Sequence, residues 1–285
     1  MIPLAGYADR LSVRPGETIA FKIANATGAP VEAEIVRVIC ADPNPAGPGI
    51  QTEPHTAELD RKAEPGAQAV PIGSYAEIDL PWPGGQVTFA ARVMPTRRKA
   101  GLVQTIASRQ DSFVLALDEE GRLVAGDGNS NGQVAKLAWP LPLHRWSHVW
   151  ITRNSDKHTL TLGWLPISDV AGPGGVGDHA EADLSDEGAG AQIAPLILAA
   201  RMRDGQARDH FNGRIENPRL WRSALSRSEV TDALKGDPRA AADARWDFAQ
   251  KIETSELVDT GPEGCHGRLI NAPTRAVRGS NWTGH

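Results

Sequence analysis

The stretch from 195 to 230 constrains the fold of this chain more than any other part. It begins with an apolar run at 196–200, which predicts a strand, and a polar turn follows. The segments 211–215 and 218–221 then place aromatic and branched side chains where two further strands would bury them. Ser226, followed by glutamate at the third position after it, predicts a capped helix start. Strands, a turn and a short surface helix in this order predict an all-β sandwich.

Length and composition agree with a folded, turn-rich protein. The chain has 285 residues, enough for one large β-sandwich or for a sandwich with a smaller companion. Its 29 glycines and 21 prolines indicate many turns, and its eight tryptophans supply large core anchors. The net charge of −5, with both signs interspersed, provides no basic surface, and we therefore expect no nucleic-acid partner.

Two cysteines do not form a disulfide framework. Cys40 and Cys265 allow either one bridge or two reduced thiols, and the composition favours reduced thiols in a cytosolic protein. The first residues lack the basic and apolar regions of a secretory signal. No apolar run reaches the roughly 18 residues of a membrane helix. The sequence therefore predicts a cytoplasmic protein without a membrane partner.

The N-terminal 66 residues are expected to form a separate region. The segment 11–13 leads into a Pro-Gly turn, 18–23 alternates polar and apolar residues, and 31–39 alternates again, which predicts a small immunoglobulin-like β region. Residues 41–66 contain closely spaced prolines, which cannot continue a ladder of hydrogen bonds. We therefore predict a loop and linker there, with domains at 1–66 and 67–278.

The larger region carries strand patterns spaced as in a sandwich. The predicted strands are 75–80, 86–93, 101–107, 112–117, 122–125, 143–152, 159–164, 244–248 and 267–270. The Gly- and acid-rich segment 168–191 is expected to be a long loop. Two short helices are predicted, at 226–234 and 238–244.

A histidine pair is the first candidate for chemistry. His144 and His148 have the spacing of a metalloprotease helix, but that motif needs glutamate directly after the first histidine to act as base. Arg145 occupies that position here, and the segment reads as a strand. The sequence therefore favours ordinary surface histidines over a zinc site.

Carboxylate pairs are the second candidate. Glu58 with Asp60, and Glu77 with Asp79, resemble the spacing that jelly-roll glycosidases use for an acid and a nucleophile on one strand. The third carboxylate of that motif is missing in both places. A stand-alone hydrolase using Glu58 or Asp79 is therefore the least favoured alternative.

Two segments rich in oxygen ligands allow calcium binding as an alternative to simple turns. The segment 127–132 lacks the residue order and the terminal glutamate of an EF-hand loop, so a tight turn is favoured. The same interpretation holds for an acidic group inside 168–191. Its members are Asp178, Glu181, Asp183, Asp186 and Glu187.

Several phrases resemble known families. The phrase HFNGRIENPRLWRSALSRSEV at 210–230 and WSHV at 146–149 resemble the closing strands of laminin-G-like, concanavalin A-like jelly rolls. The segments 6–23, 36–50 and 265–285 resemble the N-terminal part of the large (beta) subunit of N,N-dimethylformamidase. Together these resemblances cover nearly the whole chain.

The second resemblance implies a larger enzyme. Family members hydrolyse N,N-dimethylformamide to dimethylamine and formate, with a mononuclear iron held by tyrosine and glutamate in a later α/β domain. The only tyrosines here, Tyr7 and Tyr75, match no ligand motif, so no catalytic, cofactor or metal residue is assigned. The resemblance implies that 279–285 begins a linker to this C-terminal catalytic domain.

Two functions stay open. The first is a non-catalytic scaffold that packs against the catalytic domain, the small (alpha) subunit or another copy in an oligomer. The alternative is a lectin-like module for a sugar or another small ligand, which predicts exposed tryptophans on a concave sheet face, with Trp150 and Trp164 as the candidates.

Overall fold

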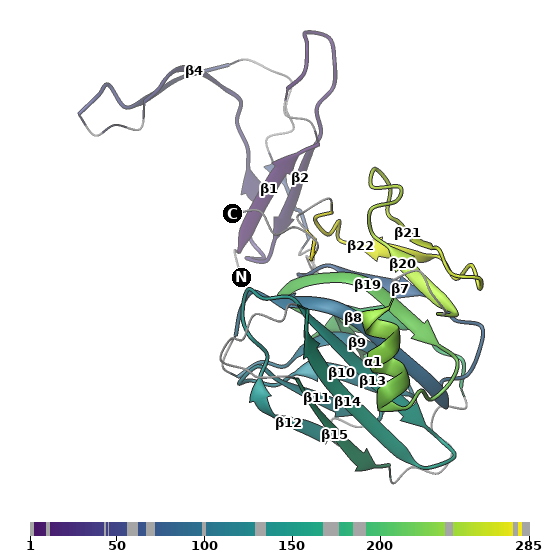
Figure 1. The fold of residues 1–285 in the computed structure, drawn as a ribbon. Helices are drawn as coiled ribbons and strands as arrows, with labels where there is room; N and C mark the ends of the chain where they lie inside the picture. Colours follow the sequence, from purple (N-terminus) through teal and green to yellow (C-terminus); the bar gives the residue numbers. More distant parts are fainter. Residues whose placement is uncertain are drawn as a thin grey trace. The chain divides into compact units, whose positions relative to one another are not determined.

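The chain divides into two compact units, 1–71 and 72–285. The computed structural model describes residues 3–9, 12–42, 44, 46–55, 62–66, 72–98, 101–128, 135–167, 177–184, 192–236, 242–275 and 279–280. Strands dominate both units, and the predicted all-β class is confirmed (Figure 1).

In its described residues, the N-terminal unit consists of three separate antiparallel strand pairs. The pairs are β1 (Leu4–Ala8) with β2 (Phe21–Asn25), β3 (Val31–Glu32) with β6 (Lys62–Ala63), and β4 (Val36–Ala41) with β5 (Ile50–Pro54). Asn25 is the single buried residue among those described in this unit. Its amide donates to the carbonyl of Ala29, and its side-chain oxygen accepts from Thr27, which closes the turn after β2.

Two predictions for this unit were wrong. The segment 11–13 is not the partner of β2, because the paired strand lies earlier, at Leu4–Ala8. The segment 41–66 is not all loop, since it contains β5 and β6. Of its described prolines, Pro48 lies in the turn between β4 and β5 and Pro54 ends β5, where no ladder hydrogen bond is lost, while Pro65 follows β6.

The larger unit is a two-layer sandwich whose strands join into one continuous order. The first layer runs β12 (Ala135–Pro140), β11 (Arg122–Gly126), β10 (Phe113–Leu117), β9 (Gln104–Arg109), β16 (Leu196–Leu198), β7 (Tyr75–Ile78), β22 (Gly267–Ile270) and β21 (Glu256–Asp259). The second layer runs β20 (Ala244–Asp247), β19 (Gly213–Trp221), β8 (Gln86–Pro95), β13 (Ser147–Asn154), β14 (Thr159–Pro166) and β15 (Asp178–Asp183).

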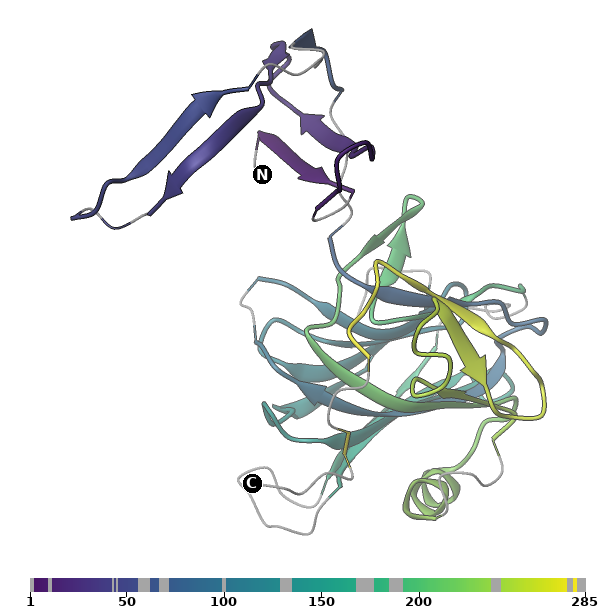
Figure 2. The same cartoon turned by 90° about the horizontal axis from the view of Figure 1, so that it is seen from above.

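The two layers meet along both edges. At one edge β20 pairs with β21, which joins the layers through hydrogen bonds. At the other edge β12 packs beside β15 (Figure 1). A small hairpin of β17 (Arg201–Arg203) and β18 (Gln206–Arg208) projects from the end of β16 (Figure 2). The sandwich predicted from strand spacing is therefore confirmed.

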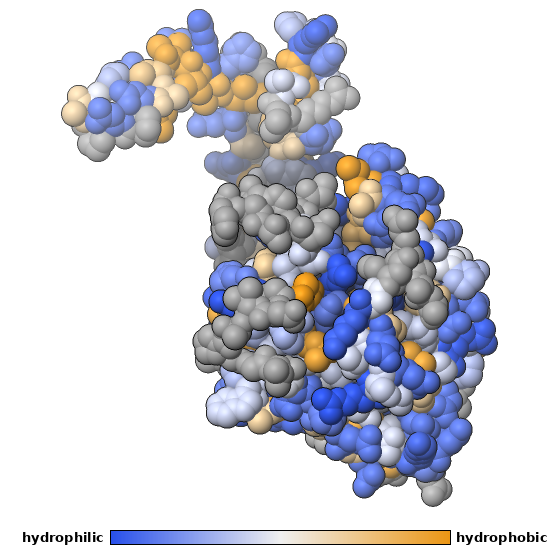
Figure 3. All heavy atoms as spheres, viewed as in Figure 1, coloured by the Kyte–Doolittle hydropathy of each residue, from blue (hydrophilic) through white to orange (hydrophobic). Residues whose placement is uncertain are grey.

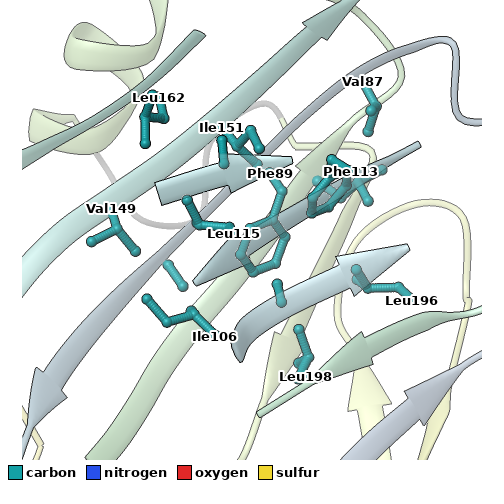
Figure 4. Packing of buried hydrophobic residues seen from close by; sticks show 14 of the residues in the cluster. Val87, Phe89, Ile106, Phe113, Leu115, Val149, Ile151, Leu162, Leu196 and Leu198 are labelled. Carbon is teal, nitrogen blue, oxygen red and sulfur yellow. The ribbon is translucent and has the colours of Figure 1, made fainter. Parts of the chain in front are cut away.

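The core lies between the layers. Phe89 from the second layer stacks on Phe113 from the first, with ring centroids 6.0 Å apart. Figure 4 shows Leu115, Ile106 and Leu198 in the same packed cluster as Val149 of the facing layer. These side chains come from every second position of their strands, which is why the alternating pattern predicted the sandwich.

A second apolar cluster covers the outer face of the second layer. The helix α1 (Arg227–Lys235) places Val230 and Leu234 against Trp150 and Trp221. Because α1 covers this face, β13 is buried on both sides. Both halves of the predicted capping box are present at Ser226, so this helix start is confirmed. Within the described residues, no helix has the length and apolar character needed to cross a membrane.

Two further predictions for the sandwich were wrong. The acid-rich segment 168–191 is not all loop, because β15 forms there as an edge strand with Ala180 and Ala182 packed against the core. The segments 211–215 and 218–221 do not give two strands, since 213–221 is one strand, β19, which a bulge interrupts. The predicted helix 238–244 lies partly outside the described residues, and its last residue, Ala244, begins β20.

Candidate functional site

An open cavity of about 710 Å³ lies at one end of the sandwich. It is bordered by β7, β16 and β22 of the first layer and by the beginning of β19 in the second. The strands β7 and β16 have four and three residues, whereas β19 has nine. The short strands leave the end of the longer one uncovered, and the cavity forms in that space.

Four aromatic side chains contribute to the cavity wall. Tyr75, Trp146, Phe211 and Phe248 all line it. The ring of His210 lies 6.1 Å from the ring of Tyr75, with the two planes tilted by 49°. Aromatic walls of this kind offer flat apolar surfaces on which a ring or an alkyl group can stack.

The first half of β19 shapes the polar side of the cavity. Gly213 is required there, because a Cβ atom would lie 2.5 Å from the carbonyl oxygen of Met94. The bulge between Glu216 and Arg219 shifts the register, and Asn217 takes a positive φ of 47°. Bulges redirect side chains. Here Glu216 and Asn217 both become part of the cavity wall.

A single arginine holds the loop that closes the opposite side. The guanidinium of Arg275 donates to the carbonyl oxygens of Phe248 (3.0 Å), Lys251 (2.9 Å), Thr254 (3.0 Å) and Gln250 (2.6 Å). Planar guanidinium groups suit such multiple contacts, since their donors diverge in fixed directions. One guanidinium therefore ties four carbonyl groups of the loop 248–254 together.

Glu216 is one of two carboxylates in the wall. Its Oε2 lies 3.6 Å from Nη1 of Arg92 and accepts from the backbone N–H of Ser280 at 3.1 Å. Arg92 also donates to the hydroxyl of Ser280 at 2.8 Å. The carboxylate is thus held by a cation and a backbone amide beside the cavity.

Behind Arg92 lies a buried histidine. His148 pairs in register with Arg92 on the neighbouring strand and is 7% exposed. Burial is the main cause that lowers the pKa of His148 to about 4, and the charges of Arg92 and Arg219 act in the same direction. Its Nδ1 has no hydrogen-bond partner among the described residues. His148 is therefore a neutral side chain at pH 7.

The arrangement suits binding better than bond cleavage. The cavity combines stacking surfaces with the carboxylate of Glu216 and the amide of Asn217, which can orient a polar group of a ligand. Asp247, the other carboxylate in the wall, accepts from the backbone of Ala249 at 2.8 Å and from Gln250, so it stabilises its own loop. Among the described residues, no group of three His, Cys, Asp or Glu could hold a metal ion.

The structure separates the histidine and carboxylate pairs. His144 is exposed in the turn before β13, whereas His148 is buried within the strand, so the prediction of two surface histidines was wrong for the second. Glu77 is engaged by Arg268 at 3.5 Å, and Asp79 is exposed. Glu58 and Asp60 lie outside the described residues.

The candidate calcium segments are also dispersed. Asp127 and Gly128 directly follow β11, and Gly128 has a φ of 88°, as expected for a turn. The rest of 127–132 lies outside the described residues. Asp178, Glu181 and Asp183 stand on β15, where Glu181 accepts from the hydroxyl of Thr161 at 2.8 Å. Asp186 and Glu187 lie outside the described residues.

The two tryptophans proposed for ligand binding are buried. Trp150 is 1% exposed and Trp164 is 3% exposed, so they cannot be the exposed binding tryptophans of the lectin-like alternative. The tryptophan that does line the cavity is Trp146, which precedes β13. Of the two cysteines, Cys40 lies on β4 and Cys265 between β21 and β22, and both are free thiols.

Sequence reasoning missed Glu216, Asn217 and Arg275. One signal was present for the first two, because Asn217-Pro218 inside a strand pattern indicates a bulge. No local signal identifies Arg275, whose partners are set by the folded position of the loop 248–254.

The chain is similar over its whole length to two curated proteins. It is 30% identical over 315 aligned positions to the N,N-dimethylformamidase beta subunit of Alcaligenes sp and 31% identical over 318 positions to that of Paracoccus aminophilus. The alignment covers 100% of this chain and 41% of each relative. The chain therefore spans about two fifths of the length of these relatives. No protein-family model matches the sequence.

The solved structures that the chain resembles share little sequence with it. A putative carbohydrate binding protein from Bacteroides ovatus gives a TM-score of 0.49 at 14% identity, over 77% of this chain and 65% of that one. A heptameric SAP-like pentraxin from Limulus polyphemus gives 0.44 at 15% identity, over 58% and 77%.

Proposed function

The chain is a relative, over its whole length, of part of the N,N-dimethylformamidase beta subunit, and from this premise we propose that it is the scaffold portion of such an amidohydrolase. In this proposal the assembled enzyme hydrolyses N,N-dimethylformamide to dimethylamine and formate. The reacting groups lie in another part of the polypeptide, and the sandwich positions that part and the small subunit.

The iron expected for the family does not fit the residues described here. The expected ligands are tyrosine and glutamate side chains, and the chain has two tyrosines. Tyr7 lies in the N-terminal unit and Tyr75 in the sandwich. Glu216 is the glutamate in the cavity wall, and its Oε2 already contacts Arg92 and the backbone N–H of Ser280. We therefore assign no step of the reaction to these residues.

One observation carries the scaffold proposal. Buried arginines of the sandwich donate hydrogen bonds to backbone carbonyl oxygens. Arg109 donates to the carbonyls of Ala194 (3.0 Å) and Trp82, and Arg153 donates to that of Ser112 (2.8 Å). Burial lowers the pKa of Arg109 to about 10. Burying a guanidinium is costly unless its donors are satisfied. The carbonyls satisfy Nε and Nη2 of Arg109, whereas its Nη1 has no partner among the described residues. These charges stabilise loops and strand ends of the sandwich itself, so they serve its structure rather than a reaction, which supports the proposal.

Two measurements test the proposal. The purified chain is incubated with N,N-dimethylformamide, and dimethylamine and bound iron are measured; we expect neither product nor stoichiometric iron. The Paracoccus aminophilus beta subunit without its aligned region is expected to lose solubility or assembly, and grafting this chain into the gap should restore both. Turnover by the isolated chain, or a truncated subunit that behaves like the intact one, would refute the proposal.

The cavity supports a second candidate function, the binding of a small ligand with a ring or alkyl body. Its support is the combination of Trp146 and Phe248 with Glu216 and Asn217 in one wall. We expect a sugar or another small-molecule hit from a glycan array or a fragment screen to be lost in Trp146→Ala. Trp139→Ala is the matched control, because Trp139 is 71% exposed on β12, outside the cavity wall. If Trp146→Ala and Trp139→Ala bind the ligand equally well, the cavity is not the binding site.

A further inference from the structure

One face of the pair β1–β2 is apolar and partly exposed, with Ile23 half-buried and Asn25 buried. The register places Leu4, Gly6 and Ala8 on the same face as Asn25, Ile23 and Phe21. Leu4 is 46% exposed and Phe21 is 55% exposed. The face bears no charged residue, whereas Lys22 stands on the opposite face beside Tyr7. Elsewhere in this unit, Figure 3 shows apolar side chains along β4, at the upper left of the view.

This strand pair cannot be stable by itself. A two-stranded antiparallel pair is marginal in water unless another layer covers its apolar side. The described residues of the N-terminal unit contain one buried residue, Asn25, and it is polar. Large exposed hydrophobic side chains also occur elsewhere in the unit. They are Val38, Ile39 and Ile50, Ile35 next to β4, and Tyr7, which is 69% exposed on the opposite face of the β1–β2 pair.

We propose that the apolar face of β1–β2, formed by Leu4, Ile23 and Phe21, is a docking surface for the remainder of the beta-subunit polypeptide. The inference rests on the proposed function, since it assumes that this chain is part of a longer one. The curated relatives supply that longer chain, because the aligned region is 41% of their length.

The size of the face favours an occupant on the same polypeptide. Side chains of this kind, half exposed, present on the order of 300 Å² of surface. A stable complex between separate molecules buries roughly 1,200–2,000 Å² in total. A docking contact within one polypeptide needs less, because the covalent connection supplies an effective concentration of about millimolar. A second copy of this chain is therefore the weaker alternative.

Hydrogen exchange tests the inference. In the free chain we expect the amides of β1 and β2 to exchange much faster than those of β8 and β13. In the graft of this chain into the Paracoccus aminophilus beta subunit, the same amides should slow by about tenfold or more. Phe21→Asp should abolish this protection, whereas Lys22→Asp, on the opposite face of the same strand, should leave it unchanged.

The outcomes separate the two proposals. A graft that is soluble and assembled but leaves β1–β2 unprotected overturns the docking inference and leaves the scaffold proposal standing. Protection already present in the free chain overturns the inference as well, and light scattering then identifies the cover. A dimer that Phe21→Asp dissociates indicates a second copy, and a monomer indicates another part of this chain. If the graft fails to assemble, the scaffold proposal fails.

Discussion

Replacing the buried histidine should remove a defined part of the acid sensitivity of the sandwich. His148 has a pKa of about 4 in the folded chain, mainly because it is buried and also because Arg92 and Arg219 are near, against an ordinary value of 6.5. Between these two values the unfolded chain binds a proton that the folded chain does not bind. The free energy of unfolding therefore falls as the pH drops from about 6.5 to about 4, and this contribution then stops changing.

The size of the effect follows from the pKa difference. A fall from 6.5 to about 4 corresponds to about 3 kcal/mol as an upper value. For a domain of this size, that is about 1 M in the midpoint of urea unfolding. All eight tryptophans lie after residue 71, so tryptophan fluorescence follows the larger unit alone.

The assay compares pH slopes rather than absolute stabilities. Urea midpoints are measured from about pH 4 to about pH 8 for the natural chain, His148→Gln and His144→Asn, a range that spans both pKa values. The slope below the ordinary histidine pKa should be shallower in His148→Gln, because glutamine does not titrate. His144→Asn is the matched control, since His144 is exposed in the turn before β13 and asparagine tolerates its φ of 58°. Identical slopes in all three proteins would refute the burial argument.

Three further substitutions test a hydrogen-bonded loop, a close contact in the packing and a helix cap of the sandwich. Arg275→Met removes the donors that hold the loop 248–254, and we expect its amides to exchange about 5–30 times faster, a local loss of about 1–2 kcal/mol; unchanged exchange would contradict the bracing role. Gly163→Ala places a Cβ against the ring of Trp150, and urea unfolding should show a loss of about 1–3 kcal/mol, whereas a neutral result would mean that the ring moves freely. Ser226→Ala removes the capping box of α1 and should cost about 1 kcal/mol by the same assay, while an unchanged midpoint would show that packing alone fixes the helix start.

Most of the sandwich could be predicted from the sequence, because its strands alternate. Gly267–Ile270 and Thr159–Pro166 were predicted almost to the residue, since apolar side chains at every second position have one core to face. The edge strand Asp178–Asp183 was not, because four of its six side chains are carboxylates or imidazole and only the two alanines pack against the core. Charged residues are common on edge strands, but in a sequence a run of charged residues predicts a loop.

The cavity could not be predicted, because residues far apart in the sequence form it. Tyr75, Glu216 and Arg275 meet only after β7, β19 and the segment after β22 have taken their places. The tryptophans were misjudged for a related reason. Trp150 alternates with core residues and would face solvent on a bare sheet, but α1 covers that side of β13. A strand pattern gives two faces and does not tell which of them another element will cover.

The position of β7 has a consequence for how the protein is made. Its neighbours in the layer are β16, which begins at Leu196, and β22, which begins at Gly267. During synthesis, Tyr75–Ile78 leaves the ribosome long before either neighbour exists, and both of its hydrogen-bonding edges stay open in the meantime. The first layer is completed only when translation has passed Ile270, so chaperone contact during that interval should concentrate on this strand and on β9 beside the gap.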